Sequence, residues 1–394
     1  MYNHIKKGRD SVLKLVSDKI IKEYIYMKKR ISFILGLLLI LITVLSGCGA
    51  DKKADLSKNA VPDKNAELTK KLDAVFTNSP SGFNGSVLIA TNGKVVLEKG
   101  YGMADIKNKI SNGKDTTFTI FSVTKQFTSM AIMMLEERGS LSVNDTVSRY
   151  IPGFKGGDKI TIHNLLSMTS GIGDYVELNP DYREYSVEEL IAKVKKEPIN
   201  FKAGTKFDYS NSNYVILGYI IEKVSGLKYG EFLKQNIFTP LKMSNTAYDP
   251  SDKERKNKAN GYITIGKYSA SDSNKLNMSY LNACGGMYST VEDLFKWSQA
   301  LNTEKLVKKS TIDKMFKPNL EGYGYGWQSN NGYKNAVSHT GGFPYKGYQT
   351  SIIKFLDNNT VVIYLQNEDD NHTREEVVTG YLKVLTDEKI ITKE

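Results

Sequence analysis

Cysteine and histidine are scarce in this chain of 394 residues, and their scarcity excludes several kinds of protein. The two cysteines, Cys48 and Cys284, cannot build a disulfide framework, and Cys284 beside two glycines is more typical of a small buried residue than of a nucleophile. No two of the four histidines have metal-ligand spacing, and no Gly-x-Ser-x-Gly sequence occurs. We therefore expect no metal and no cofactor, and neither a zinc enzyme nor an α/β-hydrolase.

Massed positive charge is also missing, although the formal net charge is +11. Residues 1–47 hold nine Lys/Arg and three Asp/Glu residues, a net of +6, so about +5 remains on the rest of the chain. The remaining lysines are scattered rather than gathered in a stripe. This distribution predicts no nucleic-acid partner, while a loose attraction to an anionic cell envelope is compatible with it.

One apolar run stands out near the amino terminus. It spans residues 31–45, follows three basic residues, and ends in Leu45-Ser46-Gly47-Cys48. This pattern is typical of a secretory signal, because the run is short for a spanning helix; an uncleaved anchor helix is the alternative. The last four residues resemble the lipobox of bacterial lipoproteins, which implies that Cys48 becomes the lipidated first residue of the mature protein.

These features predict how the chain is organised and where it resides. We expect an exported protein, lipid-anchored to the outer face of the cytoplasmic membrane. The expected segments are an upstream extension over 1–26, with the true start then at Met27, a signal peptide over 27–47, a lipidated end with a flexible polar tether over 48–69, and one folded domain over 70–394.

The domain reads as an α+β protein. The stretch GSVLIATNGKVVLEKGYGMAD predicts a hairpin that turns at Asn92-Gly93, and GYGWQ and GYQTSIIKFLDNNTVVIYLQN predict further strands. Helical patterns cover 161–168, 186–196, 212–225 and about 373–386. Strands at both ends with helices between them indicate one sheet assembled from distant parts of the chain.

A hydroxyl and an amine lie one helical turn apart in TIFSVTKQFTSMAIMMLEERGSL, residues 119–141. Apolar residues recur with a helical period after Ser122, and Gly139 lies where the helix would end. Ser122 and Lys125 then share one side of a buried helix, near its amino end. A buried ammonium without a partner is costly, so the lysine is expected as a neutral amine that takes a proton from the hydroxyl. The same spacing recurs four times elsewhere, but only Ser122 opens a long buried helix.

Two later stretches carry the other groups that such chemistry needs. Tyr209 and Asn211 lie in the polar stretch FDYSNSNY just before a helix, where a role as an N-cap or in a turn is the plain alternative. A tyrosine near an amine can relay protons, and an asparagine can bind a substrate amide. The stretch VSHTGGFPYKGYQTSIIKF places His339 to Gly342 at the start of an apolar strand, where glycines let a substrate backbone approach closely.

In this order, Ser122-x-x-Lys125, Tyr209-x-Asn211 and His339-Thr340-Gly341 resemble the three motifs of the serine β-lactamase and penicillin-binding-protein family, in its class C-like branch. The stretches DTVSRYIPGF, ITIHNLLSMTSGI, FTPLKMSNTAY, ACGGMYSTVEDLFKW and YGYGW match the same family, and the resemblance covers about residues 72–386. It implies a β-lactamase/transpeptidase-like fold: an antiparallel sheet flanked by helices, a helical lobe, and an active site between them.

The resemblance also implies the catalytic roles. Ser122 looks like the nucleophile that accepts the acyl group, Lys125 like its base, and Tyr209 like the proton relay of acylation and deacylation. A base must be neutral, and dry surroundings keep a lysine in that form.

The binding residues follow from the same resemblance. Asn211 matches the ligand of the substrate amide, and His339, Thr340 and Gly341 line the opposite wall of the cleft. The backbone N–H groups of Ser122 and Gly342 would form the oxyanion hole.

Two departures from the family pattern bear on the substrate. Many relatives have lysine where His339 stands, and a histidine is mostly neutral above about pH 6.5, so a substrate carboxylate is held less firmly than by a lysine. This disfavours a dedicated β-lactamase. Tyr345 and Lys346 also lengthen the turn after the third motif, which would reshape the rim of the cleft.

The leading hypothesis is therefore a membrane-tethered serine hydrolase that acts through an acyl-enzyme on D-amino-acid peptides or esters of the cell envelope. Its expected partners are a peptidoglycan-derived or other envelope substrate, with β-lactams as further candidate ligands. A non-hydrolytic lipoprotein that binds penicillin or cell wall is the rival from another class, and a β-lactamase is the third candidate.

Overall fold

The protein is described by a computed structural model over residues 64–177, 183–251, 255–263, 276–329, 332–343 and 347–394. The expected upstream extension, signal peptide and lipidated Cys48 lie outside the described residues. The inserted residues Tyr345 and Lys346 lie outside them too.

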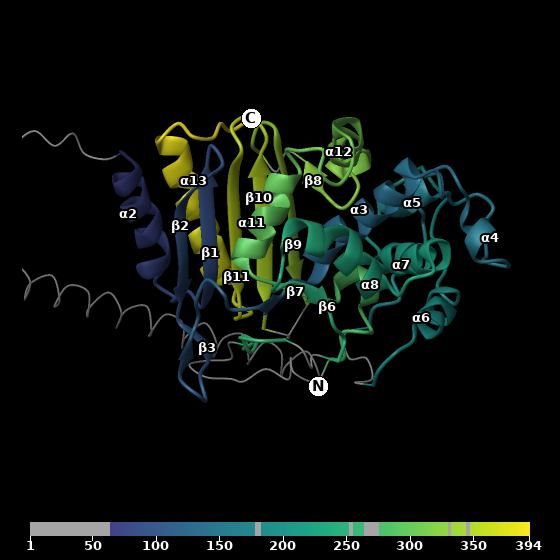
Figure 1. Cartoon of the computed structure of the whole chain (residues 1–394), viewed down its shortest axis with the longest axis horizontal. Coiled ribbons are helices and arrows are strands. Elements are labelled where there is room, and N and C mark those ends of the chain that lie inside the picture. The colour runs from purple at the N-terminus through teal and green to yellow at the C-terminus, as the bar shows by residue number, and fades with distance from the viewer. Residues whose placement is uncertain (1–63, 178–182, 252–254, 264–275, 330–331, 344–346) are drawn as a thin grey trace, which may run out of the picture. The chain divides into compact units, whose positions relative to one another are not determined.

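A six-stranded antiparallel sheet forms the centre of the described domain (Figure 1). Its strand order is β2-β1-β11-β10-β9-β8, so strands from both ends of the domain pair directly. The strands are β1 (Gly85–Thr91), β2 (Lys94–Tyr101), β8 (Gln328–Ser329), β9 (Ala336–Gly342), β10 (Gln349–Phe355) and β11 (Thr360–Gln366). The expected sheet from distant parts of the chain is confirmed.

The hairpin of β1 and β2 turns at Asn92 and Gly93, as the sequence predicts. Both residues have positive φ, of 50° and 71°. Two consecutive left-handed residues make the kind of tight turn whose twist matches that of paired strands, and Asn-Gly is the sequence that adopts it most readily.

Two expectations about strands are wrong in detail. His339 to Gly342 end β9 instead of starting the next apolar strand, which is β10. In GYGWQ only Gln328 belongs to a strand, because the chain passes close to another backbone here: a Cβ added to Gly326 would lie 2.7 Å from the Lys125 carbonyl oxygen. The stretch serves this close approach rather than sheet pairing.

Helices cover both faces of the sheet (Figure 1). The helices α2 (Lys64–Thr77) and α13 (Asn371–Asp387) pack on one face, over a core that includes Leu72, Phe76 and Tyr381. The helices α3 (Thr124–Glu137) and α11 (Val291–Ala300) lie on the other face. Because α2 starts at Lys64 and buries Leu68, residues 64–69 are not part of a flexible tether, which corrects that boundary.

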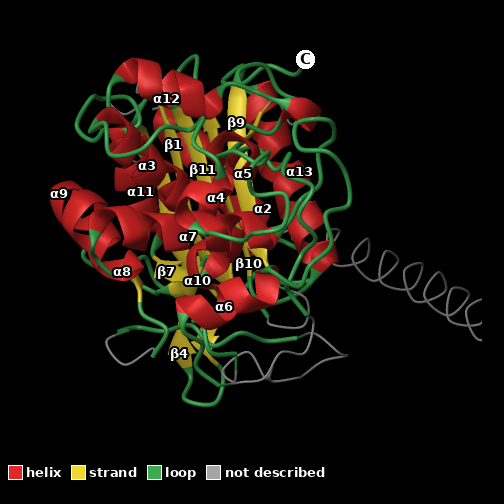
Figure 2. Cartoon of the chain, turned by 90° about the vertical axis from the view of Figure 1, so that its right-hand side faces the viewer, coloured by secondary structure: helices red, strands yellow, loops and turns green. Residues whose placement is uncertain are grey.

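A helical lobe stands beside the edge of the sheet that carries β9, with α7 in front of the strands when viewed from that side (Figure 2). Its longest helix, α7, is fully apolar at its centre and packs on α3, α5, α6 and α10. The lobe and its connections comprise α4 (Val147–Tyr150), α5 (Ile162–Leu166), α6 (Val187–Val194), α7 (Asn211–Ser225), α8 (Tyr229–Leu233), η2 (Lys234–Phe238), α9 (Thr239–Leu241), α10 (Asn282–Gly285) and α12 (Lys309–Phe316).

Short elements connect the lobe to the sheet. They are β3 (Met103–Asp105), β4 (Ile110–Ser111), β5 (Phe118–Thr119), η1 (Phe121–Val123), β6 (Ala247–Tyr248), β7 (Met287–Ser289) and η4 (Leu320–Gly322). Sheet, flanking helices and helical lobe together confirm the expected α+β class and β-lactamase/transpeptidase-like fold. Among the described helices, none is both long and apolar enough to cross a membrane.

Candidate active site

Ser122 lies in η1, the single turn that leads from β5 into α3. The residue before it, Phe121, has a φ of 43°, which is a left-handed conformation that bulky residues rarely adopt. Its ring packs on Phe343 and Tyr348, and these contacts hold the unusual backbone in place. The strained turn sets the direction in which the partly exposed Ser122 side chain leaves the chain.

Lys125 lies one turn after Ser122 and is fully buried. Its Nζ atom is 3.1 Å from Ser122 Oγ, 2.8 Å from Asn211 Oδ1 and 2.7 Å from the Cys284 carbonyl oxygen. In the described part of the chain, Lys125 forms no ion pair with a carboxylate. The structure therefore brings together the serine and lysine that the sequence predicted, and surrounds the amine with neutral oxygen atoms.

Asn211 is the first residue of α7, and its side chain is oriented by Asp174. The Asn211 amide nitrogen donates to Asp174 Oδ2 at 2.9 Å, and the Asn211 backbone N–H donates to Asp174 Oδ1 at 3.1 Å. Burial raises the pKa of the Asp174 carboxyl, and the two hydrogen bonds from Asn211 oppose that rise. Asp174 thus turns the Asn211 oxygen toward Lys125. The sequence analysis did not identify Asp174, although it lies two residues after the end of the family-like stretch ITIHNLLSMTSGI.

Tyr209 lies two residues before α7, with its ring over the lysine. The Lys125 Nζ atom is 4.9 Å from the centre of the Tyr209 ring, and the side chain is 37% exposed. Its hydroxyl makes no hydrogen bond within the described part of the chain, so it can turn toward a bound molecule. This geometry is compatible with the predicted proton relay.

His339 lies on β9 with only 6% of its surface exposed. Its Nδ1 atom is 2.6 Å from the Thr340 carbonyl oxygen, which can only accept, so Nδ1 carries the proton. Its Nε2 atom then accepts from the Tyr323 hydroxyl at 3.0 Å. Burial is the main cause that lowers the pKa of His339, to about 3. His339 is neutral at physiological pH and does not present a cation to the cleft.

The glycines of the third motif bring β9 against the serine turn. A Cβ added to Gly341 would lie 2.1 Å from the Ile120 carbonyl oxygen, so only glycine fits there. The Thr350 hydroxyl donates to the same oxygen at 3.0 Å and ties β10 to this corner. The close approach that we expected for a substrate backbone is thus made by the protein itself. Thr340 and Gly342 remain exposed at the free end of β9, beside the Ser122 turn.

Cys284 contributes its backbone and not its thiol. The side chain is 1% exposed, and burial raises the pKa of the thiol to about 11, so it is a poor nucleophile. The sequence-based interpretation of Cys284 as a small buried residue is confirmed. Its carbonyl oxygen, which no side-chain pattern reveals, fixes one N–H of Lys125.

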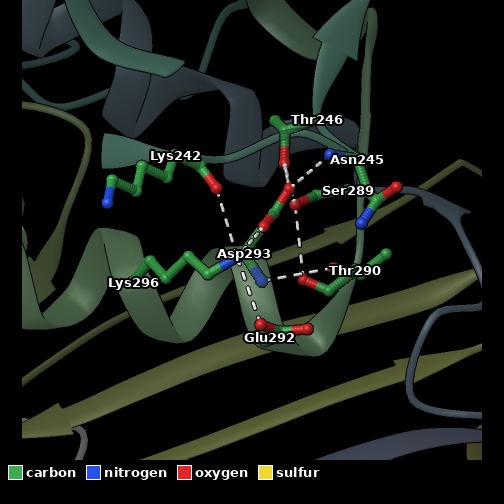
Figure 3. Close-up of polar contacts among 8 residues, drawn as sticks. All are labelled: Lys242, Asn245, Thr246, Ser289, Thr290, Glu292, Asp293 and Lys296. Carbon is green, nitrogen blue, oxygen red and sulfur yellow. Dashed lines mark hydrogen bonds and ion pairs between the residues drawn. The ribbon is translucent and has the colours of Figure 1, made fainter. Parts of the chain in front are cut away.

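The short helix α10, which carries Cys284, is held in place by a hydrogen bond to β6. The Asn282 side chain of α10 donates to the Tyr248 hydroxyl at 3.1 Å, and Tyr248 ends β6. Asn245 and Thr246 directly precede β6. The buried carboxylate of Asp293 in α11 accepts from the Asn245 backbone N–H at 2.8 Å and from the Thr246 hydroxyl at 3.0 Å (Figure 3).

The Asp293 network also ties α11 to the lobe (Figure 3). Lys296 donates to Asp293 at 2.9 Å and to the Lys242 carbonyl oxygen at 3.2 Å. The Thr290 hydroxyl caps α11 by accepting from the Asp293 N–H at 3.2 Å. These bonds fix the connection that positions α10.

Among the described residues, no group of three or more His, Cys, Asp or Glu side chains could hold a metal ion.

Comparisons with known proteins agree with this architecture. The family model described as Beta-lactamase matches residues 72–385. The protein PbpX of Bacillus subtilis (strain 168), whose name places it among the penicillin-binding proteins, is 33% identical over 315 residues, which are 78% of this chain and 78% of its own length. Penicillin-binding protein 4* of the same organism is 31% identical over 321 residues, covering 75% of this chain and 70% of its own.

A solved structure shows the same relationship in three dimensions. The octameric penicillin-binding protein homologue from Pyrococcus abyssi is 29% identical, covers 81% of this chain and 76% of its own, and superposes with a TM-score of 0.69. The chain therefore belongs to the β-lactamase family, as a serine hydrolase related to the penicillin-binding proteins.

Proposed function

We propose that this protein is an exported, membrane-tethered hydrolase that forms an acyl-enzyme on Ser122 and acts on D-amino-acid peptides or esters of the cell envelope. The observation that carries the proposal is the set of three contacts made by the Lys125 amine. Two of its partners, Asn211 Oδ1 and the Cys284 carbonyl oxygen, are acceptors only. A neutral amine donates its two N–H groups to them and directs its lone pair at the Ser122 hydroxyl.

The chemistry follows from this arrangement. Lys125 takes the proton of Ser122 while Oγ attacks the substrate carbonyl, and the backbone N–H groups of Ser122 and Gly342 receive the developing negative charge. Tyr209 passes a proton to the departing nitrogen or oxygen. Water then attacks the acyl-enzyme along the reverse proton path, and Ser122 is restored.

Asn211 has one group left for the substrate. Its Oδ1 atom accepts from Lys125, and one hydrogen of its amide nitrogen is donated to Asp174. The second hydrogen can be donated to the amide carbonyl of an acyl group. This donor supports an N-acylated amino acid as the acyl part of the substrate.

A cation near the third motif supports an acidic leaving group. Buried, neutral His339 does not supply one, but Arg374 of α13 shares a groove with Thr340. The Arg374 side chain forms no ion pair or hydrogen bond within the described part of the chain. A carboxylate, such as the one that ends a D-amino-acid peptide, would satisfy it together with the Thr340 hydroxyl.

The proposal is tested with the purified mature protein and three substrate classes: activated esters, D-alanyl peptides and β-lactams. Repeated turnover of an ester or peptide, lost in Ser122→Ala, is expected. At most one acylation per molecule across all three classes would show instead a receptor that binds penicillin or cell wall. Turnover of β-lactams alone would show a β-lactamase.

The tether is a separate part of the proposal, supported by the apolar run that ends in Leu45-Ser46-Gly47-Cys48. Two acyl chains on Cys48 would anchor the protein stably, because one chain gives only marginal membrane binding. Mass spectrometry of the mature amino terminus is expected to find a lipidated Cys48. An unmodified Cys48, or a Cys48→Ser variant that stays on the membrane like the parent, would refute the anchor.

A further inference from the structure

A groove of about 470 Å³ leads away from the proposed catalytic residues around the edge of β9. Tyr209, His339 and Thr340 line its mouth, and Val378 and Leu382 of α13 line its far end. The edge is open here because β8 pairs only with Val337 and Ser338. A molecule at Ser122 can therefore continue past β9 onto the face of the sheet that α13 covers.

The far part of the groove is apolar. Tyr333, Ile353, Val378 and Leu382 line it, and each is only partly buried and packs against the core beneath α2 and α13. Partly exposed apolar side chains that face one groove gain most when a bound apolar group removes them from water. The groove is thus suited to a hydrocarbon chain.

Two polar groups in the same groove lack partners in the described part of the chain. Arg374 lies between the mouth and the apolar part, and lines a neighbouring pocket with Thr340 and Gly342 as well. Tyr381, at the floor, is fully buried, and its hydroxyl forms no hydrogen bond. The Tyr381 hydroxyl has no accessible surface, so Arg374 is the polar group of this pair that the anionic part of a bound molecule can reach.

The position of Tyr209 decides which part of the substrate enters. The relay tyrosine donates its proton to the leaving group, and Tyr209 lines this groove at its mouth. We propose that the groove behind β9 is a leaving-group site that selects substrates whose leaving group joins an anionic head to an apolar chain. The head meets Arg374 and Thr340, and the chain lies along Val378 and Leu382. This inference rests on the proposed acyl-enzyme function of Ser122.

The step balances as an ordinary ester cleavage. The Ser122 Oγ–carbon bond forms, the bond from the acyl carbon to the leaving oxygen breaks, and the proton of Ser122 passes through Lys125 and Tyr209 to that oxygen. The leaving group departs as a 2-hydroxy acid. Water then releases the acyl group, which is the same whatever the leaving group was.

The test uses depsipeptides that share one N-acetyl-D-alanyl group and differ only in the leaving hydroxy acid, from glycolate to 2-hydroxyoctanoate. All members of the series form the same acyl-enzyme, and kcat/KM reports the acylation step. A difference in kcat/KM between members therefore arises from the interaction of the leaving group with its site. We expect kcat/KM to rise at least tenfold along the series. Equal kcat/KM values across a series that is still hydrolysed through Ser122 would overturn the inference and leave the proposed function intact, whereas no turnover of any member would count against the function itself.

Leu382→Trp should narrow the groove, and Leu356→Trp is its matched control. Leu382 is partly exposed and Leu356 is 40% exposed, but Leu356 lies in the turn between β10 and β11 and does not line the groove. Leu382→Trp should remove the preference for the long chain while kcat/KM for glycolate stays within about twofold; the control should change neither. If Leu382→Trp keeps the preference and melts like the parent, the chain lies elsewhere and the inference is wrong. Should Leu382→Trp not fold, Val378→Ala, which widens the groove, must weaken the preference by several-fold.

Discussion

Two lysines are buried among the residues that the structure describes, and only one of them is placed for chemistry. Lys125 and Lys354 are 0% and 1% exposed, and neither forms an ion pair in the described part of the chain. Lys354 has a single partner, Asn359 Oδ1 at 2.8 Å, and burial lowers its pKa to about 8. Lys125 has two acceptors that use up its N–H groups and a hydroxyl that faces the remaining position. Burial alone makes an inert amine, whereas the placement of its partners makes a base.

The most severe test of this difference is Lys125→Arg. We expect acylation of Ser122 to fall about a thousandfold or more, because guanidinium does not release its proton in proteins, although a cation of similar length would serve a purely structural role. Acylation is measured by the mass gain of the intact protein on exposure to an activated ester. An arginine variant that acylates within tenfold of the parent would make Lys125 a structural cation like any other.

Tyr209→Phe tests the relay beside the lysine. The loss of turnover should be about a hundredfold, the usual scale of general acid–base catalysis. The melting temperature should not change, because the Tyr209 hydroxyl has no hydrogen bond within the described part of the chain. Steady-state kinetics and thermal unfolding are measured on the same sample. Turnover within a few-fold of the parent would remove Tyr209 from the mechanism.

Asp174→Asn tests whether the acceptors of Lys125 must be held in place. Asp174 contacts Asn211 and not the lysine, so it acts as a positioning residue. We expect kcat to fall about tenfold with KM little changed, because misplacing a catalytic group slows the chemical step. Asp174→Glu, which keeps the carboxylate, should recover part of the loss. Equal activity of all three proteins would show that Asn211 holds its orientation unaided.

The smallest effect on activity is expected at Lys354, whose replacement should change stability instead. Lys354→Met should leave turnover within about twofold and raise the free energy of unfolding at pH 7 by about 1 to 2 kcal/mol. The pKa of Lys354, lowered to about 8, implies that burying its charge costs about 3 kcal/mol. The variant removes this cost but also loses the hydrogen bond to Asn359, which offsets part of the gain.

The pH dependence of this gain follows from the same pKa. Below pH 8 Lys354 is charged in both the folded and the unfolded state. Between about pH 8 and 10.4 only the unfolded state still binds the proton, so the stability of the parent rises with pH. The advantage of Lys354→Met should therefore shrink over this range. An advantage that does not change with pH would mean that Lys354 is not buried as a cation at neutral pH.

The sequence predicts the parts of the fold that depend on local pattern. The Asn92-Gly93 turn, the helix after Ser122 and the helix after Asn211 need only φ preferences and apolar period, and all three are confirmed. The start of α2 was missed because its first turn is polar, and only Leu68 and residues beyond it reach the sheet.

The parts of the site that sequence reasoning missed depend on contacts between distant segments. The Cys284 carbonyl is a backbone group and has no side-chain signature, and Asp174 acts only through Asn211. Tyr323, which follows η4 and precedes β8, binds the His339 ring across the fold. The degree to which His339 is buried could not be read from its neighbours in the chain. The reactive pair itself was accessible because serine and lysine lie within one helical turn.

The most direct test of the central claim is rapid quenching of the parent and of Lys125→Arg with an activated ester, followed by peptide mass mapping. We expect a burst close to one equivalent in the parent, with the acyl group on Ser122 alone, and no burst in Lys125→Arg. An acyl group on any other residue, or a burst in Lys125→Arg as fast as in the parent, would contradict it.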